Sequence, residues 1–382
     1  MRAERMLLTG SRRRTVTPGT TYNFAGGPSM LPASVLAQVR EEFAGEELAG
    51  ESGRPTILEA PFSSARFRSL IEDTELRLRR LVGISDEYVV LFLQGGATAQ
   101  FALVPLNLLG NAGRADYIET GYWSHRAIEE AQRYGWINVA SSGAASHFSS
   151  IPKPDGWRLD PRAAYVHITS NETADGLEYH WTPDVGSTAL VSDMTAAFLT
   201  RPIDVARYAV IYASAQKNLG VAGLTLVVVR RDVLGRAHPH TPSTFHYARQ
   251  ADARSMLNTP PMFAIYVANL ILQWLDREGG LAEMEQRAQQ RSDIVYAAID
   301  RSDGFYRCPV ERQDRSRINI CFRPANNDLT PLFLEQAMRH GLLNLAGHGR
   351  IGGLRASLYN AMPVAGAHTL AQWLGEFARR YG

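Results

Sequence analysis

Apolar runs alternate with amphipathic stretches through the middle of the chain. The segments 208–214 (YAVIYAS) and 224–230 (LTLVVVR) are almost continuously apolar, which is typical of strands covered on both faces in a parallel sheet. The further runs that predict strands lie at 87–94, 164–170 and 189–193. Helical stretches between such strands, among them 97–109, indicate a layered α/β unit with a mostly parallel sheet.

The pattern changes near residue 262. Two long helical stretches follow, separated by the pair Gly279-Gly280, which is a signal that ends helices. Beyond them, "RINICF" and "LRASLY" predict strands, and "HTLAQWLGEFARRY" predicts a terminal helix. We therefore expect a large α/β domain at 22–277 and a smaller C-terminal α+β domain at 278–382. The basic segment 1–21 is expected to be a disordered arm.

Length and composition narrow the class of protein. The 382 residues can form one large or two ordinary domains. The net charge of +2 comes from intermixed acids and bases, so nothing favours a nucleic acid or an anionic membrane as partner. No apolar run approaches the roughly 20 residues of a membrane helix, and the two cysteines cannot form a disulfide framework or a zinc site. We expect a cytoplasmic protein without a metal centre.

Lysine is rare in this chain, and one lysine has an unusual place. Of the 40 Lys and Arg residues only Lys153 and Lys217 are lysines, and Lys153 lies between two prolines in a predicted loop. Lys217 follows the strand at 208–214, so it should lie at the sheet edge where ligands of open α/β folds bind. A lysine amine forms a Schiff base with an aldehyde cofactor, whereas a guanidinium does not. The alternative is a structural lysine that caps a helix or pairs with a carboxylate.

Three further features suit an aldehyde cofactor with a phosphate and a pyridine ring. Gly95-Gly96 lies between a strand and a helix, where backbone N–H groups can approach a phosphate, although a plain tight turn is the alternative. Asp193 ends the strand at 189–193 and could keep a pyridine nitrogen protonated, or simply cap a helix. Trp123 could stack on the ring or pack in the core. Taken together, their order along the chain predicts a pyridoxal phosphate site.

Seven segments carry a resemblance to a known family. They are "NFAGGPSMLP", "FLQGGATAQF", "ADYIETGYWSHRAIEEA", "SNETADG", "TRPIDVARYAVIYASAQKNLGVAGLT", "LNTPPMFAIY" and "GGLRASLYNAMP". With them, residues 22–382 resemble the phosphoserine aminotransferase family, within the class V aminotransferases of fold type I. The resemblance implies a fold type I α/β transferase, pyridoxal 5'-phosphate as cofactor, and a homodimer with shared active sites.

The resemblance also implies roles for single residues. Lys217 would carry the cofactor, Asp193 would pair with its ring nitrogen, and Trp123 would stack on its ring. Further cofactor contacts are implied for Thr173 near the ring hydroxyl, for Gly96, Ala97, Thr98 and Gln216 near the phosphate, and, from a second subunit, for Asn258 and Thr259.

The implied reaction is a ping-pong transfer of an amino group between a 2-amino acid and a 2-oxo acid, with glutamate as the amino donor. Arg355 in "GGLRAS" would clamp the substrate α-carboxylate through a bidentate pair. The amine of Lys217 would move the α-proton, a task that needs a pKa well below that of a guanidinium.

The family's substrate-phosphate pocket is altered in this chain. Phe62 and Ser63 stand where relatives carry histidine and arginine, and Thr98 replaces a further arginine. In "GHGR" the family histidine is kept as His348, while the next arginine moves to Arg350. Three lost charged hydrogen bonds, at about 1.5–3 kcal/mol each, would weaken binding of a phosphate. We therefore expect a paralogue with a non-phosphorylated or altered substrate, whose pocket keeps the α-carboxylate clamp.

Three other interpretations stay open. The first is a true phosphoserine aminotransferase of serine biosynthesis, which converts 3-phosphohydroxypyruvate with glutamate and has rebuilt its phosphate pocket from Arg66, Arg68 or Arg350. The second is a catalytically silent regulatory protein that binds pyridoxal phosphate, although such a protein has no need of Arg355. The third is nucleic-acid binding through the arginine-rich N-terminus. A class V cysteine desulfurase fits less well, because neither cysteine lies in a predicted mobile loop.

Overall fold

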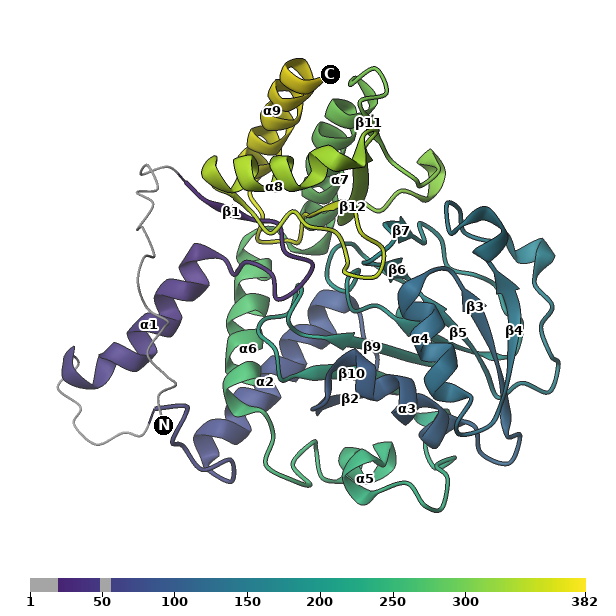
Figure 1. Cartoon of the computed structure of the whole chain (residues 1–382). Coiled ribbons are helices and arrows are strands. Elements are labelled where there is room, and N and C mark those ends of the chain that lie inside the picture. Colours follow the sequence, from purple (N-terminus) through teal and green to yellow (C-terminus); the bar gives the residue numbers. More distant parts are fainter. Residues whose placement is uncertain (1–19, 49–55) are drawn as a thin grey trace, which may run out of the picture.

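The computed structural model of the chain describes residues 20–48 and 56–382 (Figure 1). Nearly all of the arm expected at 1–21 lies outside these residues. Every strand that the apolar runs predict is present, with its ends within two residues of the expected ones. None of the helices in the two described ranges is long and apolar enough to cross a membrane.

A seven-stranded sheet forms the centre of the larger part of the molecule. Only β10 runs antiparallel to its neighbours, and the other neighbouring pairs are parallel. The prediction of a mostly parallel sheet in a fold type I transferase is therefore confirmed. In sheet order the strands are β2 (Tyr88–Leu93), β10 (Thr225–Arg230), β9 (Val210–Ser214), β8 (Ala189–Asp193), β5 (Tyr165–Thr169), β3 (Arg114–Glu119) and β4 (Trp136–Ser142).

Helices cover both faces of this sheet, which is why its central strands are mostly apolar. Alternate side chains of β2 enter different cores: Val90 and Phe92 pack on one face, and Val89 and Leu91 on the other. The first face carries α2 (Ala65–Val82) and α6 (Met262–Arg277), and α1 (Ala33–Leu48) packs against α6. The second face carries α3 (Gly96–Leu108), α4 (Tyr122–Ala131) and α5 (Tyr247–Asp252).

The C-terminal part has its own small sheet and its own core, and it stands above the larger part in Figure 1. Its antiparallel strands are β11 (Tyr306–Arg307), β12 (Asn319–Pro324) and β14 (Leu354–Ser357). Its helices are α7 (Gly280–Asp300), α8 (Thr330–Arg339) and α9 (Val364–Tyr381). The first described strand, β1 (Tyr22–Asn23), pairs in parallel with β13 (Leu342–Leu343) and so belongs to this part. The domain boundary expected after residue 277 falls in the turn between α6 and α7 and stays a prediction.

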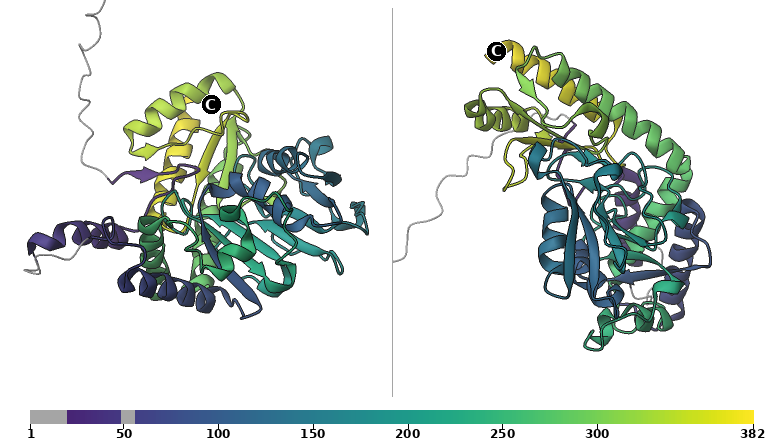
Figure 2. Two further views of the ribbon diagram at one scale, coloured as in Figure 1. Left: turned by 90° about the horizontal axis from the view of Figure 1, so that it is seen from below. Right: turned by 90° about the vertical axis from the view of Figure 1, so that its right-hand side faces the viewer.

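Six strands of the large sheet end at the same edge. Strands β3, β4, β5, β8 and β9 are parallel, and β2 has the same direction because two antiparallel pairings through β10 separate it from β9. The segments that follow these strands hold the predicted cofactor residues. One of them is a hairpin of β6 (Asn171–Glu172) and β7 (Leu177–Glu178), which lies beside the C-terminal part in Figure 1. Figure 2 shows the whole chain from two further directions.

The aromatic core of the C-terminal part generates a stability prediction. Phe333 is fully buried, and its ring centroid lies 5.0 Å from that of Phe377 and 6.0 Å from that of Trp373. Phe333→Ala should lower the free energy of unfolding by about 3–5 kcal/mol, because it leaves a cavity. Denaturant unfolding measures this loss. Met338→Ala, on the exposed side of the same helix, should change it by only about 0.5 kcal/mol, and equal effects would contradict the described packing.

Candidate active site

Lys217 is buried in the turn after β9, and its amine meets the hairpin that follows β5. Its Nζ donates a hydrogen bond of 2.5 Å to Thr173 Oγ1. Burial lowers the pKa of Lys217 to about 8, because an ammonium loses its hydration there; the charge of Asp193 opposes this shift and that of Arg355 adds to it. A substantial fraction of the amine is therefore neutral near pH 7–8, as a nucleophile or a base must be.

The segment "NFAGGPS" covers the turn that carries the lysine. Ser29 donates its backbone N–H to the Gln216 carbonyl at 2.8 Å, and its hydroxyl donates to the Lys217 carbonyl. Gly27 has a φ of +136°, in the region that favours glycine, and a Cβ on it would lie 3.6 Å from Lys217 Cε. The segment "NFAGGPS" therefore restrains the backbone and the aliphatic chain of Lys217.

Asp193 lies beside the lysine strand, at the end of β8, with 5% of its surface exposed. Its Oδ1 accepts a hydrogen bond of 2.8 Å from the Thr195 backbone N–H. Burial raises the pKa of this carboxyl group, while the Thr195 hydrogen bonds and the charge of Lys217 oppose the rise. A buried carboxyl group of this kind suits a cationic partner such as a protonated ring nitrogen.

Trp123 is half-buried near the start of α4, and it is not enclosed in the core. Its ring lies edge-on to Tyr122, with ring centroids 5.0 Å apart, and it is 5.9 Å from the His348 ring. Its indole Nε1 is buried without a hydrogen-bond partner among the described residues. Because buried indole N–H groups are normally paired, this position favours a contact with a bound group over plain core packing.

The first turn of α3 forms a cradle for an anion. Gly95 and Gly96 have φ values of +100° and +70°, and no described side chain caps this helix, so its first N–H groups are free. The adjacent Ser214 hydroxyl donates to Gln216 Oε1, and a Cβ on Gly96 would lie 3.6 Å from Ser214 Oγ. Ala97 and Thr98 belong to the same turn. These donors fit the phosphate of pyridoxal phosphate.

Arg355 reaches this site from β14 of the C-terminal part. Its Nη1 donates to the Thr173 carbonyl at 3.2 Å, and its Nε is buried without a partner in the described structure. The guanidinium lies against Gly26, where a Cβ would be only 2.3 Å from Nη2. Thr173 therefore contacts both Lys217 and Arg355, through its hydroxyl and its carbonyl.

A second group of basic residues lies beside Trp123. The His348 ring packs on Tyr122 with ring centroids 4.3 Å apart. Burial lowers the pKa of His348, and the charges of Arg355 and Arg350 add to this effect. Arg126 Nη1 donates to the Tyr122 hydroxyl at 3.2 Å. These residues form what we call the basic rim: Tyr122, Arg126, His348 and Arg350.

Four predicted residues lie apart from the Lys217 cluster. Asn258 and Thr259 are exposed, and the Thr259 carbonyl accepts a hydrogen bond of 2.9 Å from Gln94. Phe62 packs at the border of the core beneath α2, and Ser63 beside it is exposed. The roles implied for these four residues stay predictions.

Sequence reasoning missed two acids close to the cluster. Glu172 is fully buried and Asp175 is 9% exposed, and both contact the backbone at the start of α4. A signal was available, because "SNETADG" places two acids in a short turn directly after an apolar strand. The contacts themselves join segments about 50 residues apart, which no local pattern indicates.

Comparison with known proteins identifies the relatives of this chain. The sequence profile of the family described as "Aminotransferase class-V" matches residues 21–370. A phosphoserine aminotransferase of Nitrosomonas europaea is 47% identical over 368 residues, which cover 94% of this chain and 99% of the relative. A protein of the same name from Laribacter hongkongensis is 47% identical and covers 95% of this chain and 100% of its own length.

Solved structures agree with these relatives. The phosphoserine aminotransferase of Bacillus circulans subsp. alkalophilus superposes with a TM-score of 0.91 at 38% identity, over 95% of this chain and 99% of that one. The phosphoserine aminotransferase of Trichomonas vaginalis with bound pyridoxal phosphate gives a TM-score of 0.87 at 34% identity, over 93% and 99% of the two chains.

The expectation of a paralogue with a non-phosphorylated or altered substrate is wrong. The relatives that match nearly the whole chain at 43–47% identity are named phosphoserine aminotransferases. That expectation gave most weight to the side chains replaced at Phe62, Ser63 and Thr98, although the energies of neighbouring charged groups are not additive. The basic rim beside Trp123 contains Arg350, which the alternative interpretation named as a substitute for them.

The buried amine generates a prediction on pH dependence. In the cofactor-free protein, labelling of Lys217 by an amine-selective reagent should rise with pH around a midpoint near 8. Because the charge of Asp193 raises this pKa, Asp193→Asn should move the midpoint to lower pH. Mass spectrometry of peptides can follow both lysines, with exposed Lys153 as the internal reference. An unchanged or higher midpoint in the variant would show that Asp193 does not act on the amine.

Proposed function

The chain belongs to the class-V aminotransferase family, and we propose that it transfers an amino group from glutamate to 3-phosphohydroxypyruvate, giving phosphoserine and 2-oxoglutarate. It is a pyridoxal-phosphate-dependent aminotransferase. The observation that carries the reaction class is the buried amine of Lys217, with a lowered pKa, at the carboxyl edge of the sheet. The names of the near-full-length relatives support phosphoserine as the substrate.

Six features of the site would hold the cofactor. Pyridoxal phosphate supplies an aldehyde that accepts amino groups and a ring that withdraws electrons from the substrate α-carbon. The α3 N-terminus with Gln216 would bind its phosphate, and Asp193 would keep a proton on its ring nitrogen. Trp123 would pack against the ring, Thr173 would bond near its hydroxyl, and Lys217 would bind its aldehyde.

Lys217 would also carry the proton of the reaction. With the substrate bound, its Nζ would take the proton from the substrate α-carbon, because its lowered pKa leaves it neutral. Burial under the C-terminal part would keep water from the amine. The bond to the Thr173 hydroxyl would orient Nζ between the two half-reactions.

The substrate would be held at both of its ends. Arg355 would bind the α-carboxylate, since its guanidinium lies within the site and its Nε has no described protein partner. We assign the substrate phosphate to Arg350 with His348, in the basic rim beside Trp123. Phe62 and Ser63 would line the outer part of the pocket.

The assembly and the location belong to the same proposal. We propose a homodimer in which Asn258 and Thr259 reach the cofactor phosphate of the second subunit, since both are exposed. Exposed apolar side chains of α1, Leu36 and Phe43, suit a subunit interface, and α1 projects from the body of the molecule in Figure 2. A cytoplasmic location agrees with the two free cysteines.

Replacement of the lysine tests the reaction. Lys217→Arg should abolish turnover of phosphoserine with 2-oxoglutarate, because a guanidinium neither binds the aldehyde nor gives up its proton near pH 8. Lys153→Arg, in an exposed loop, should behave like the wild type in the same coupled assay. Normal turnover by Lys217→Arg would refute the assigned role of the lysine.

The substrate is tested by a half-reaction screen with single amino acids, followed by the absorbance of the bound cofactor. Phosphoserine and glutamate should both react. Arg350→Ala should raise the KM for phosphoserine about tenfold or more, through loss of a charged hydrogen bond, and leave the glutamate half-reaction unchanged. Arg307→Ala, at an exposed position of β11, is the matched control. If phosphoserine is inert while glutamate reacts, the proposed substrate is refuted and the aminotransferase assignment is not.

A further inference from the structure

The start of α4 lacks the local cap that its sequence position would allow. Gly121 occupies the N-cap position and has no side chain to offer the helix, whereas Ser, Thr, Asp or Asn commonly accepts the first N–H groups there. The Ser124 hydroxyl accepts instead from the backbone N–H groups of Thr120 and Gly121, at 2.8 and 2.9 Å. The next three N–H groups, which belong to the first turn, need partners from elsewhere.

Two buried carboxyl groups of the β6–β7 hairpin supply these partners. Asp175 Oδ2 accepts from the Tyr122 N–H at 2.8 Å. Glu172 uses both oxygens: Oε2 accepts from the Trp123 N–H at 2.8 Å, and Oε1 accepts from the Ser124 N–H at 2.9 Å. All three N–H groups are therefore bonded to a segment about 50 residues away in sequence.

The absence of a side chain at residue 121 is required by this arrangement. A Cβ on Gly121 would lie 2.5 Å from Asp175 Oδ2 and 2.9 Å from Glu172 Cδ. The φ of Gly121 is 166°, an extended conformation open to any residue, so its backbone does not call for glycine. Glycine at this position serves the close approach of the two acids.

The two acids are unusual for so deeply buried a position. Among the described residues neither forms an ion pair, and burial followed by the nearby charge of Asp175 raises the pKa of Glu172 to about 8. Buried carboxyl groups without a cation are costly unless hydrogen bonds satisfy them, and the partial positive charge of a helix N-terminus offsets part of that cost. A single polar side chain at residue 121 would cap α4 without the free-energy cost of burying two carboxyl groups. The arrangement therefore does more than stabilise the helix.

The hairpin turn that carries the two acids also carries a residue of the candidate active site. Thr173, between the two acids, contacts the amine of Lys217 and the guanidinium of Arg355. We propose that Glu172 and Asp175 are positioning residues, which clamp the first turn of α4 and thereby fix the ring of Trp123 relative to Lys217 and Arg355. The inference rests on the proposed function, because it takes Trp123 as the ring that packs against pyridoxal phosphate.

Two substitutions test the clamp from opposite sides. Glu172→Gln replaces one acceptor oxygen by an NH₂ group, which faces a backbone N–H. Gly121→Ala retains both acids in the sequence, but its added Cβ pushes their carboxyl groups away from the helix. Each variant should bind pyridoxal phosphate with a Kd about tenfold higher than that of the wild type. This is the order expected for one unsatisfied buried N–H. Each should also weaken the circular dichroism of the bound cofactor, which reports the asymmetry of its surroundings.

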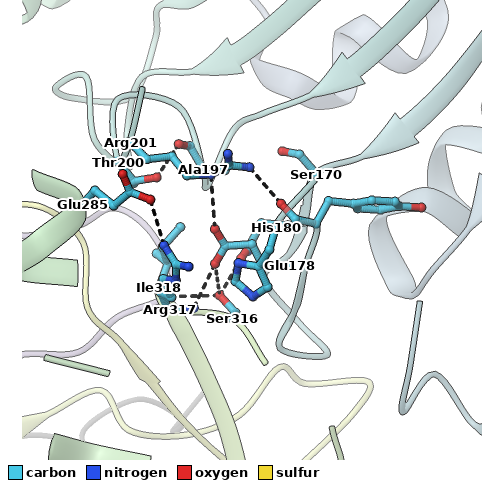
Figure 3. Close-up of polar contacts among 12 residues, drawn as sticks. Ser170, Glu178, His180, Ala197, Thr200, Arg201, Glu285, Ser316, Arg317 and Ile318 are labelled. Carbon is cyan, nitrogen blue, oxygen red and sulfur yellow. Dashed lines mark hydrogen bonds and ion pairs between the residues drawn. The ribbon is translucent and has the colours of Figure 1, made fainter. Parts of the chain in front are cut away.

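Glu178→Gln is the matched control. Glu178 lies in β7 of the same hairpin and is equally buried, at 1% exposure, but its carboxylate points toward Ser316 and Arg317 (Figure 3). It accepts from the Arg317 N–H at 2.8 Å and lies 3.9 Å from Arg201 Nε. This variant should lower the melting temperature, and its Kd for the cofactor should stay within about twofold of the wild type.

The outcomes separate the clamp from a purely structural cap. If Glu172→Gln and Gly121→Ala lower the melting temperature but keep the wild-type Kd and circular dichroism, the proposal is refuted. If Glu172→Gln does not fold, Gly121→Ala decides alone, because it retains both acids. A wild-type enzyme that binds the cofactor but leaves phosphoserine unchanged would refute the proposed substrate, while the two binding readouts would still decide the clamp.

Discussion

The common direction of six strands is the constraint from which the site follows. Strands β2, β3, β4, β5, β8 and β9 all end at one edge of the sheet. The segments after five of them, β2, β3, β5, β8 and β9, each place one kind of group at that edge: free N–H groups, an indole, a hydroxyl, a carboxylate and an amine. None of these groups is near another in sequence, and the direction of the strands alone brings them together.

The second feature on which the site depends is the burial of its ionisable groups. Lys217, Asp193 and Glu172 are all at least nine-tenths buried, and burial is the largest influence on the pKa of each of them. It makes the amine easier to deprotonate and the acids harder to ionise. The pKa values of Lys217 and Glu172 are both about 8, and perturbed pKa values of this kind are common where protons are transferred. The two cores of the large sheet and the C-terminal part provide the low-dielectric surroundings.

Local patterns predicted a large share of this structure. Apolar runs placed five strands of the large sheet, because strands covered on both faces are mostly apolar, and the same logic located Lys217 and Asp193 at strand ends. The runs did not indicate β3 and β4, which contain polar residues, and β4 is exposed or half-buried at all but one position. The contacts of Glu172 could not be predicted, since they depend on tertiary pairing between distant segments. The substrate was misjudged for a related reason: the count of arginines lost at aligned positions outweighed Arg350, whose place beside Trp123 and His348 only the tertiary structure gives.

The pairing of β1 with β13 has a consequence for the order in which the chain folds. The ribosome makes Leu342 some 320 residues after its partner Tyr22. The large sheet, whose strands end at Arg230, can assemble while β1 still has no neighbour. Closing so long a loop is slow and comes late. Arg355, which follows β13, thus joins Lys217 among the last of these contacts, so that the newly made chain becomes competent for chemistry only once both parts have been synthesised.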